Sequence, residues 1–434
     1  MTSRNVFVLG LDEQNLATLR DVDMPDLRLH PLLSVEELQG DEIDLPALLD
    51  KATEQVETFD DTVDAIVGYW DFPTSSMVPM LCQRFGLRSA DLEAVVKCEH
   101  KYWSRLEQSK VIEDYPAFGL VDPFEETSPP EGLDYPFWVK PVKSFSSELA
   151  FKVCDENEFA DALAEIRDGI HRIGDPFEFV LNQLDLPPEI EAAGGNACLA
   201  EAEITGAQLT VEGYNDGTDI HIYGVVDSAP YAGSSSFLRY EYPSTLSEDM
   251  IARACDASRK VIRQMGLESV AFNIEFFADP VREELALLEV NPRHSQSHAR
   301  LFELVDGTPN HQCMIRLALG LDPALPRGEG PYEHAAKWFL RRFDDAYVRQ
   351  VPSAADIERV EEHVSDSWVT ILVDEGVQLS AAAPQDSYSY ELANIFIGAH
   401  SEQELHEKYE QCVAGLPFEF DEQDASGMAH GGTP

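Results

Sequence analysis

Over the first 90 residues, short apolar runs alternate with longer stretches that are apolar on one side only. The runs at 6–9 and 65–70 have the length and apolar content of buried strands. The stretch 74–85 predicts a helix that begins at a Thr/Ser cap and ends at Gly86. Strands that alternate with helices pack as a parallel sheet with helices on its faces. We therefore predict an α/β fold with an N-terminal parallel-sheet domain over residues 1–92.

From residue 93 onward the pattern is that of a mixed α+β domain, in which consecutive strands are joined by turns. The expected elements are a loop at 122–136, a strand at 137–140, an exposed connection at 183–197, two or three strands between 199 and 227 with turns at Gly206 and at 215–217, a helix at 246–265 that ends at Gly266, and hairpin strands at 270–277 and 284–290. We expect this domain to cover residues 93–323.

A third unit is expected after Gly320 and Pro323, since the basic stretch 337–342 opens a new run of strand-like and helical segments. We assign residues 324–420 to this C-terminal α+β domain. The remaining residues, 421–434, have few side chains to bury and predict a disordered tail.

The chain is strongly acidic, which limits its partners. Its 434 residues contain 31 Lys and Arg against 80 Asp and Glu, a formal net charge of −49. With 44% hydrophobic residues the chain has an ordinary globular composition, so wholesale disorder is excluded. The missing cationic surplus argues against nucleic acid and anionic membranes as partners. A surface adapted to high salt explains the acids that are spread along the chain, and an acidic face for a basic partner is the alternative.

The sequence indicates a cytoplasmic protein. The segment at 1–14 lacks the basic flank, long apolar stretch and cleavage site of a signal peptide, and no run of about 18 apolar residues predicts a membrane span. The seven cysteines are scattered and never in CxxC spacing, which suits a reducing compartment and gives no zinc signal.

Two glutamates and an asparagine on the predicted hairpin are the strongest chemical signal. Glu275 and Glu289 each lie inside an apolar strand, and Asn291 and Arg293 follow Glu289 in the sequence EVNPR. If the two strands pair, three oxygen ligands converge, with Glu289 sharing a strand face with Leu287 and Asn291. Mg²⁺ prefers such ligands and is usually shared with phosphate oxygens. The alternative is that these acids are merely solvated strand residues.

Two lysines in a chain poor in lysine add to this signal. Lys140 ends an apolar strand in YPFWVKP, and Lys101 lies at the start of a predicted helix. A lysine in such a buried position needs an anionic partner such as phosphate or carboxylate. The serine-rich loop that follows Lys140, with Ser146 and Ser147, can offer hydroxyls and backbone amides to phosphate. Either lysine alone would be read as a surface cation.

In order and spacing these motifs resemble the ATP-grasp superfamily over almost the whole chain. The resemblance implies an N-terminal pre-ATP-grasp domain, an ATP-grasp domain with a lid at about 130–205, and a C-terminal domain like that of biotin carboxylase. Lys101 and Lys140 correspond to the two nucleotide lysines, and Arg293 corresponds to the transition-state arginine. The resemblance also implies ATP and Mg²⁺ (or Mn²⁺) as cofactors, with Glu275, Glu289 and Asn291 as metal ligands.

The segment 199–208 resembles the hinge that reads adenine in this superfamily. The resemblance implies that Glu201 accepts from the adenine amino group and that Glu203 and Ile204 line the ring. Gln208 stands where a ribose-binding glutamate is common.

The superfamily shares a first step in which ATP phosphorylates a carboxylate, after which a nucleophile displaces phosphate. Within it the chain looks most like the biotin carboxylase and L-amino-acid-ligase branch. Ser297 occupies the place of the glutamate that handles bicarbonate in biotin carboxylase, so joining a small carboxylate to an amine is the better expectation. A biotin carboxylase-like carboxylating enzyme and a catalytically silent nucleotide sensor or scaffold are the alternatives.

Polar residues after Arg293 are candidates for the substrate pocket, and each of them could equally be a structural polar group. These candidates are His294, Ser295, Gln296 and His298, with Arg239 from an earlier segment. Glu212 is expected to be a surface acid, with a contact to the acceptor amine as the alternative. A homodimer is a possible assembly, as pairs of subunits are common in the branch.

Overall fold

The computed structural model describes residues 3–144, 148–381 and 389–422. The chain divides into two compact units, one formed by Met1–Asp227 with Tyr242–Gly330 and the other by Ser228–Glu241 with Pro331–Pro434. The segment 228–241, which the sequence assigned to the central domain, thus belongs with the C-terminal part. The division into three domains remains a prediction.

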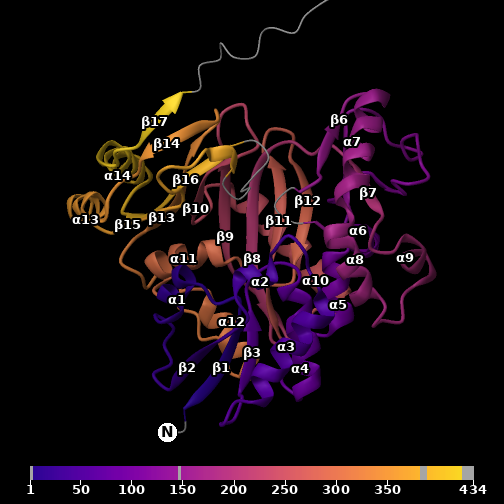
Figure 1. The fold of residues 1–434 in the computed structure, drawn as a ribbon, viewed down its shortest axis with the longest axis horizontal. Helices are drawn as coiled ribbons and strands as arrows, with labels where there is room; N and C mark the ends of the chain where they lie inside the picture. The colour runs from indigo at the N-terminus through magenta and orange to yellow at the C-terminus, as the bar shows by residue number, and fades with distance from the viewer. Residues whose placement is uncertain (1–2, 145–147, 382–388, 423–434) are drawn as a thin grey trace, which may run out of the picture. The chain divides into compact units, whose positions relative to one another are not determined.

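The first unit begins with the predicted parallel sheet, in the strand order β2-β1-β3 (Figure 1). Its strands are β1 (Arg4–Leu9), β2 (Leu27–Leu32) and β3 (Ala65–Gly68), and its helices are α1 (Glu13–Leu19), α2 (Val35–Leu38), α3 (Leu45–Glu57) and α4 (Thr74–Phe85). Helix α4 ends at Gly86 in the left-handed conformation, as predicted. Its predicted Thr/Ser cap is wrong, because Pro73 precedes the first turn and no side chain caps it.

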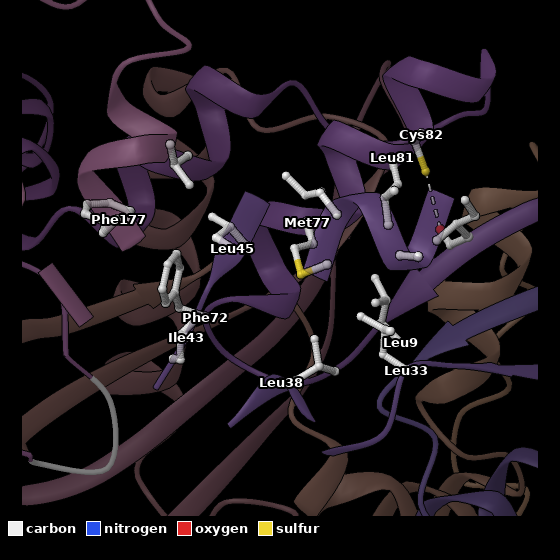
Figure 2. Packing of buried hydrophobic residues seen from close by; sticks show 14 of the residues in the cluster. Leu9, Leu33, Leu38, Ile43, Leu45, Phe72, Met77, Leu81, Cys82 and Phe177 are labelled. Carbon is white, nitrogen blue, oxygen red and sulfur yellow. Dashed lines mark hydrogen bonds between the residues drawn. The ribbon is translucent and has the colours of Figure 1, made fainter. Parts of the chain in front are cut away.

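One apolar core joins this sheet to a helix from the predicted lid. Figure 2 shows Phe72 near Phe177, and Met77, Leu81 and Leu9 farther along; all five side chains belong to one buried cluster. Phe72 and Phe177 meet edge to face with their ring centroids 5.6 Å apart. Burial of these side chains supplies the main driving force for holding the segments together. This shared core explains why the structure does not separate residues 1–92 from the remainder of the first unit.

A small antiparallel sheet in the order β4-β7-β5-β6 carries the predicted strand of Lys140 and the hinge. Its strands are β4 (Phe118–Val121), β5 (Phe137–Pro141), β6 (Phe151–Val153) and β7 (Cys198–Ala202), accompanied by helices α7 (Glu156–Gly169), α8 (His171–Leu181) and α9 (Pro188–Ala193). The predicted connection at 183–197 thus contains a short helix.

The strands β12, β11, β8 and β9 lie in that order in the larger sheet of the first unit. Helix α10 ends at Gly266 as predicted, and β11 and β12 form the predicted antiparallel hairpin. The elements are α5 (Leu92–Glu99), α6 (Lys101–Gln108), β8 (Ala207–Asn215), β9 (Ile220–Pro230), α10 (Glu248–Met265), β11 (Val270–Asp279), β12 (Glu284–Asn291), the 3-10 turn Gln296–His298, α11 (Ala299–Asp306) and α12 (His311–Ala318).

A β-bulge in the hairpin corrects one expectation about strand faces. Glu275 lies opposite Glu289, but the next pair is Phe276 with Leu287, so Leu288 has no counterpart in the register. The extra residue shifts the alternation. Leu287 and Val290 are therefore both in the apolar core, and Leu287 does not share a face with Glu289.

The second unit contains the strands β10, β13, β16 and β15 in that order and a separate pair formed by β14 and β17. Its elements are β10 (Phe237–Tyr242), β13 (His334–Arg342), β14 (Ala346–Gln350), α13 (Ala354–His363), β15 (Ser367–Ile371), the 3-10 turn Leu379–Ala381, β16 (Tyr390–Ala399), α14 (Glu402–Gly415) and β17 (Glu419–Glu422). Residues 421 and 422 thus belong to a strand, contrary to the predicted start of the tail, and residues 423–434 lie outside the described part. Within the described chain, no helix is both long and apolar enough to cross a membrane.

Candidate active site

The hairpin brings the predicted oxygen ligands together. Glu275 of β11 lies directly opposite Glu289 of β12, and Asn273 lies opposite Asn291. Asn291 Nδ2 donates to Asn273 Oδ1 over 3.0 Å and lies 3.5 Å from Glu275 Oε1. Gln208, from the neighbouring strand β8, donates to Glu275 Oε2 over 2.8 Å. Three adjacent strands thus position the two carboxylates and the amide at one place.

The two glutamates repel each other when both are ionised. Burial, together with repulsion from Glu289, raises the pKa of Glu275 to about 7. A divalent cation between the two carboxylates would remove this repulsion, and two carboxylates with an amide suit Mg²⁺, which keeps waters and phosphate oxygens as its other ligands. In the described part of the chain, no cluster of three or more His, Cys, Asp and Glu side chains could hold a metal ion. Two carboxylates and one amide would leave the remaining positions around Mg²⁺ to waters or phosphate oxygens.

Lys101 faces this carboxylate pair from the first residue of α6. Its Nζ donates to Glu289 Oε1 over 2.7 Å and to the carbonyl of Ser144 over 2.8 Å. Burial alone would raise the pKa of Glu289, but the ammonium of Lys101 outweighs it and holds that pKa below its usual range. The first predicted lysine therefore lies beside the two carboxylates and contacts one of them.

Lys140 projects from β5 and forms a buried ion pair with Glu201 of the adjacent strand β7. Arg105 of α6 donates to the same carboxylate from Nε and Nη2, over 3.1 and 2.8 Å. Burial opposes ionisation of Glu201, but these two cations lower its pKa to about 2. The sequence predicted the lysine and the glutamate but not their direct contact, and it missed Arg105 altogether.

Arg293 is held by an acid that no sequence motif had indicated. Its Nη2 lies 3.0 Å from Asp71 Oδ2, and Lys143 Nζ lies 2.8 Å from Asp71 Oδ1. Lys143 is buried, with Glu99 as a second anion 3.4 Å away. Burial disfavours the charged form of Asp71, but Lys143 and Arg293 keep its pKa well below the usual range. The available signal was the place of Asp71, shortly after the apolar strand β3.

The residues that come after Arg293 find partners within the protein. His294 Nε2 and His311 Nδ1 are 2.9 Å apart and share a hydrogen bond, and both rings are buried. Glu212 is fully buried, which corrects the predicted surface acid, and its carboxylate accepts from the amide of Ser295 over 3.0 Å and pairs with His298 Nδ1 over 2.8 Å. These contacts match the structural alternative for His294, Ser295 and His298, and their contact with substrate remains a prediction.

The other predicted residues are spread over both units. Glu203 and Ile204 lie in the turn after β7, where Glu203 accepts from Lys152 over 2.6 Å. Gln296 is half-buried in the turn before α11. Arg239 lies in the second unit and pairs with Glu241. Ser146 and Ser147 lie outside the described residues.

Parts of the chain are similar in sequence to known proteins. Residues 133–299 match the family model of the ATP-grasp domain. A stretch of 76 residues, 18% of this chain, is 36% identical to part of the carbamoyl phosphate synthase large chain of Nostoc sp. (strain PCC 7120). This match spans 7% of the length of that relative.

Solved structures resemble the chain over nearly its whole length. The L-amino acid ligase from Bacillus licheniformis superposes with a TM-score of 0.72 over 97% of this chain and 100% of the ligase, at 14% identity. The biotin carboxylase domain of the Hydrogenobacter thermophilus 2-oxoglutarate carboxylase, a dimer in complex with MgADP, ADP and bicarbonate, superposes with a TM-score of 0.66 over 97% of this chain and 91% of that domain, at 13% identity. Residues 133–299 therefore match an ATP-grasp domain, and the chain as a whole has the fold of these solved structures.

Proposed function

We propose that the protein is an ATP-dependent ligase that activates a small carboxylate as an acyl phosphate and joins it to an amine, releasing ADP and phosphate. The observation that carries this proposal is the register of Glu275 with Glu289, with Asn291 beside them and Lys101 in contact with Glu289. A protein that only senses nucleotide has no need of two like charges forced together in a half-buried place.

In the first step, the residues of this chain would bind ATP and stabilise the transfer of its γ-phosphoryl group. Mg²⁺, when bound by Glu275, Glu289 and Asn291, would neutralise charge on the phosphates of ATP. Lys101 adds a cation beside the same phosphates, and Arg293 is suited to the charge that develops on the transferred phosphoryl group. The substrate carboxylate oxygen attacks the γ-phosphorus, and ADP leaves.

The second step needs no nucleophile from the protein. The amine nitrogen attacks the acyl carbon, the acyl–phosphate bond breaks, and inorganic phosphate leaves with the electron pair of that bond. The amine loses a proton as the amide forms. Exclusion of water from the site protects the acyl phosphate from hydrolysis in the meantime.

An amine ligase is favoured over a carboxylating enzyme by two observations. Ser297 stands where biotin carboxylase has its bicarbonate-handling glutamate. The L-amino acid ligase from Bacillus licheniformis also has the higher TM-score of the two solved structures, 0.72 against 0.66. Because the biotin carboxylase domain is a dimer, we extend the proposal to a pair of subunits in solution, which light scattering would test.

An ADP-release screen over pools of small carboxylates and amines with Mg²⁺ tests the function. We expect release that depends on one carboxylate and one amine together. Transfer of ¹⁸O from the labelled carboxylate to the phosphate product would support the acyl phosphate. Release that requires bicarbonate would instead favour a carboxylating enzyme. Binding of ATP without turnover on any pool would favour the sensor.

A further inference from the structure

Arg105 is an almost fully buried cation that none of the predicted roles uses. It lies on α6 one helical turn after Lys101, so both side chains project from the same face of that helix. Its side chain is 2% exposed. A guanidinium in such a place must have its donors satisfied by the protein, because an unpaired buried charge is very costly.

The guanidinium contacts two different parts of the site. Nε and Nη2 donate to Glu201 Oε2 on β7, and Nη2 also donates to the carbonyl of Leu288 on β12 over 2.8 Å. Nη1 donates to Gln108 Oε1 over 2.6 Å, which fixes the plane of the group from its own helix. One rigid fork of donors thus joins the small sheet to the hairpin of β11 and β12, which carries the proposed metal ligands Glu275, Glu289 and Asn291.

The contact with β7 holds Glu201, which is expected to contact the adenine base. Glu201 also pairs with Lys140, so Arg105 and Lys140 share one carboxylate. If Arg105 were removed, Lys140 would be left as the only cation on Glu201, and its ammonium would be drawn toward that carboxylate. Arg105 therefore sets how firmly Lys140 is held and where its ammonium points.

The contact with β12 holds the backbone next to Glu289, which is expected to bind the metal. Leu288 is the bulge residue without a counterpart on β11, and Glu289 is the next residue along the strand. At a bulge the ladder does not fix the backbone as it does elsewhere, so a bulge can re-aim the side chain beside it. The hydrogen bond from Arg105 supplies the missing restraint on the peptide unit that leads into Glu289.

We propose that Arg105 is a positioning residue that couples the nucleotide-base side of the site to the metal side, by holding Glu201 with Lys140 and the bulge before Glu289 at the same time. The inference rests on the proposed function to the extent that the site must bind nucleotide and metal. A lysine at this position would keep the charge but lack the fork that reaches both acceptors.

The test measures two affinities in Arg105→Lys and in the wild type. One is the affinity for ADP in EDTA by calorimetry, and the other is the affinity of the ADP-saturated protein for Mn²⁺ by electron paramagnetic resonance. Arg359→Lys is the control, because Arg359 of α13 is exposed and pairs with Asp356 of the same helix. Both titrations are made well below the unfolding temperature and are normalised to folded protein.

We expect Arg105→Lys to weaken ADP binding about tenfold and Mn²⁺ binding about fivefold, and Arg359→Lys to change neither. If both affinities stay at the wild-type values, or if only one of them changes, the coupling role is overturned, whatever happens to the unfolding temperature. A wild type that binds neither ADP nor Mn²⁺ would overturn the proposed function as well.

Should Arg105→Lys not fold, Gln108→Met makes the same test, because it removes the partner of Nη1 and leaves Arg105 itself in place. The side chain of Gln108 bonds to Arg105 and Ser104, and to neither Glu201 nor the bulge, so a purely local effect would leave both affinities unchanged. A smaller loss in both affinities would support the coupling, and wild-type values for either one would refute it.

Discussion

Replacing Asp71 with Asn should impair catalysis without removing any group from the proposed metal and nucleotide sites. Asp71 is the anion between Arg293 and Lys143, at 3.0 and 2.8 Å. The amide of Asn is uncharged, so D71N leaves Arg293 without its ionic partner. Besides any hydrogen bond to the Asn amide oxygen, the guanidinium keeps among the described residues the hydrogen bond from Nη1 to the carbonyl of His294, which is long at 3.4 Å. The guanidinium would then sample several orientations.

Two effects of D71N can be given a magnitude, the loss of stability and the fall in kcat. Removing one partner of a buried ion pair typically costs about 3–5 kcal/mol. We expect the lower end, about 3 kcal/mol, because the Asp71 side chain is 17% exposed and Lys143 retains Glu99 at 3.4 Å. Misplacing a catalytic group by about 1 Å costs about 100-fold in rate, so kcat should fall by about that factor. The KM for ATP should change little, since the ion pair of Lys140 with Glu201 is separate from that of Lys143 with Asp71.

Steady-state ADP release with the substrate pair found in the screen measures kcat and KM, and thermal unfolding measures stability. Asp44→Ala is the control, since it removes the cap of α3, where Asp44 accepts from the amide of Ala47 over 3.0 Å. It should cost about 1 kcal/mol of stability and leave kcat unchanged. If D71N turns over at the wild-type rate per folded molecule, Asp71 does not orient Arg293 and the reasoning fails.

The metal site, a buried histidine and the surface charge each give one more prediction. Glu289→Gln should abolish ADP release, and the stability lost with the Lys101 ion pair should be only partly offset by the disappearance of the repulsion on Glu275; an active variant would refute the metal assignment. Burial lowers the pKa of His100 to about 4, below about 6.5 in the unfolded chain, so its contribution is intact above pH 6.5 and is lost as pH falls toward 4. His100→Asn keeps a hydrogen-bond acceptor at the N-cap of α6. In urea unfolding, the free energy of unfolding of this variant should fall by about 2 kcal/mol less than that of the wild type between pH 7 and pH 5. Equal falls in the two proteins would contradict this prediction. With a net charge of −49, the unfolding temperature should rise between 0.1 and 3 M KCl, as calorimetry can check, and a flat curve would count against a surface adapted to salt.

The parts of the site that the sequence could predict depend on short-range pairing. Glu275 and Glu289 are 14 residues apart on a hairpin, so strand alternation and one turn suffice to place them opposite each other. The start of α6 at Lys101 and the strand of Lys140 are equally local features. The prediction of strand faces missed the bulge because it assumed regular strand pairing, and the sequence around Leu288 gives no sign of an extra residue.

The supporting ion pairs could not be predicted from local pattern because their partners are distant in sequence. Arg105 and Glu201 are 96 residues apart, and Arg293 and Asp71 are 222 apart. Arg105 and Glu201 are buried, and Arg293 and Asp71 mostly so, only because the fold supplies each with a partner. The neighbouring residues in the sequence therefore do not identify these charges as part of the site. In a chain with 80 acids, most carboxylates are surface groups, which makes the few buried ones hard to single out by type.

One signal nevertheless separates these buried acids from the rest, and it applies to more than the metal hairpin. Glu275 stands out because it interrupts an apolar strand, FNIEFF. Glu212, in LTVEGY, has the same setting, and the structure finds it fully buried and bound to the loop after Arg293. Burying a carboxylate costs several kcal/mol, so a strand retains one only where the fold supplies partners for it. An acid inside a run of strand-forming residues therefore predicts a polar contact across the sheet, even where the identity of the partner must come from the structure.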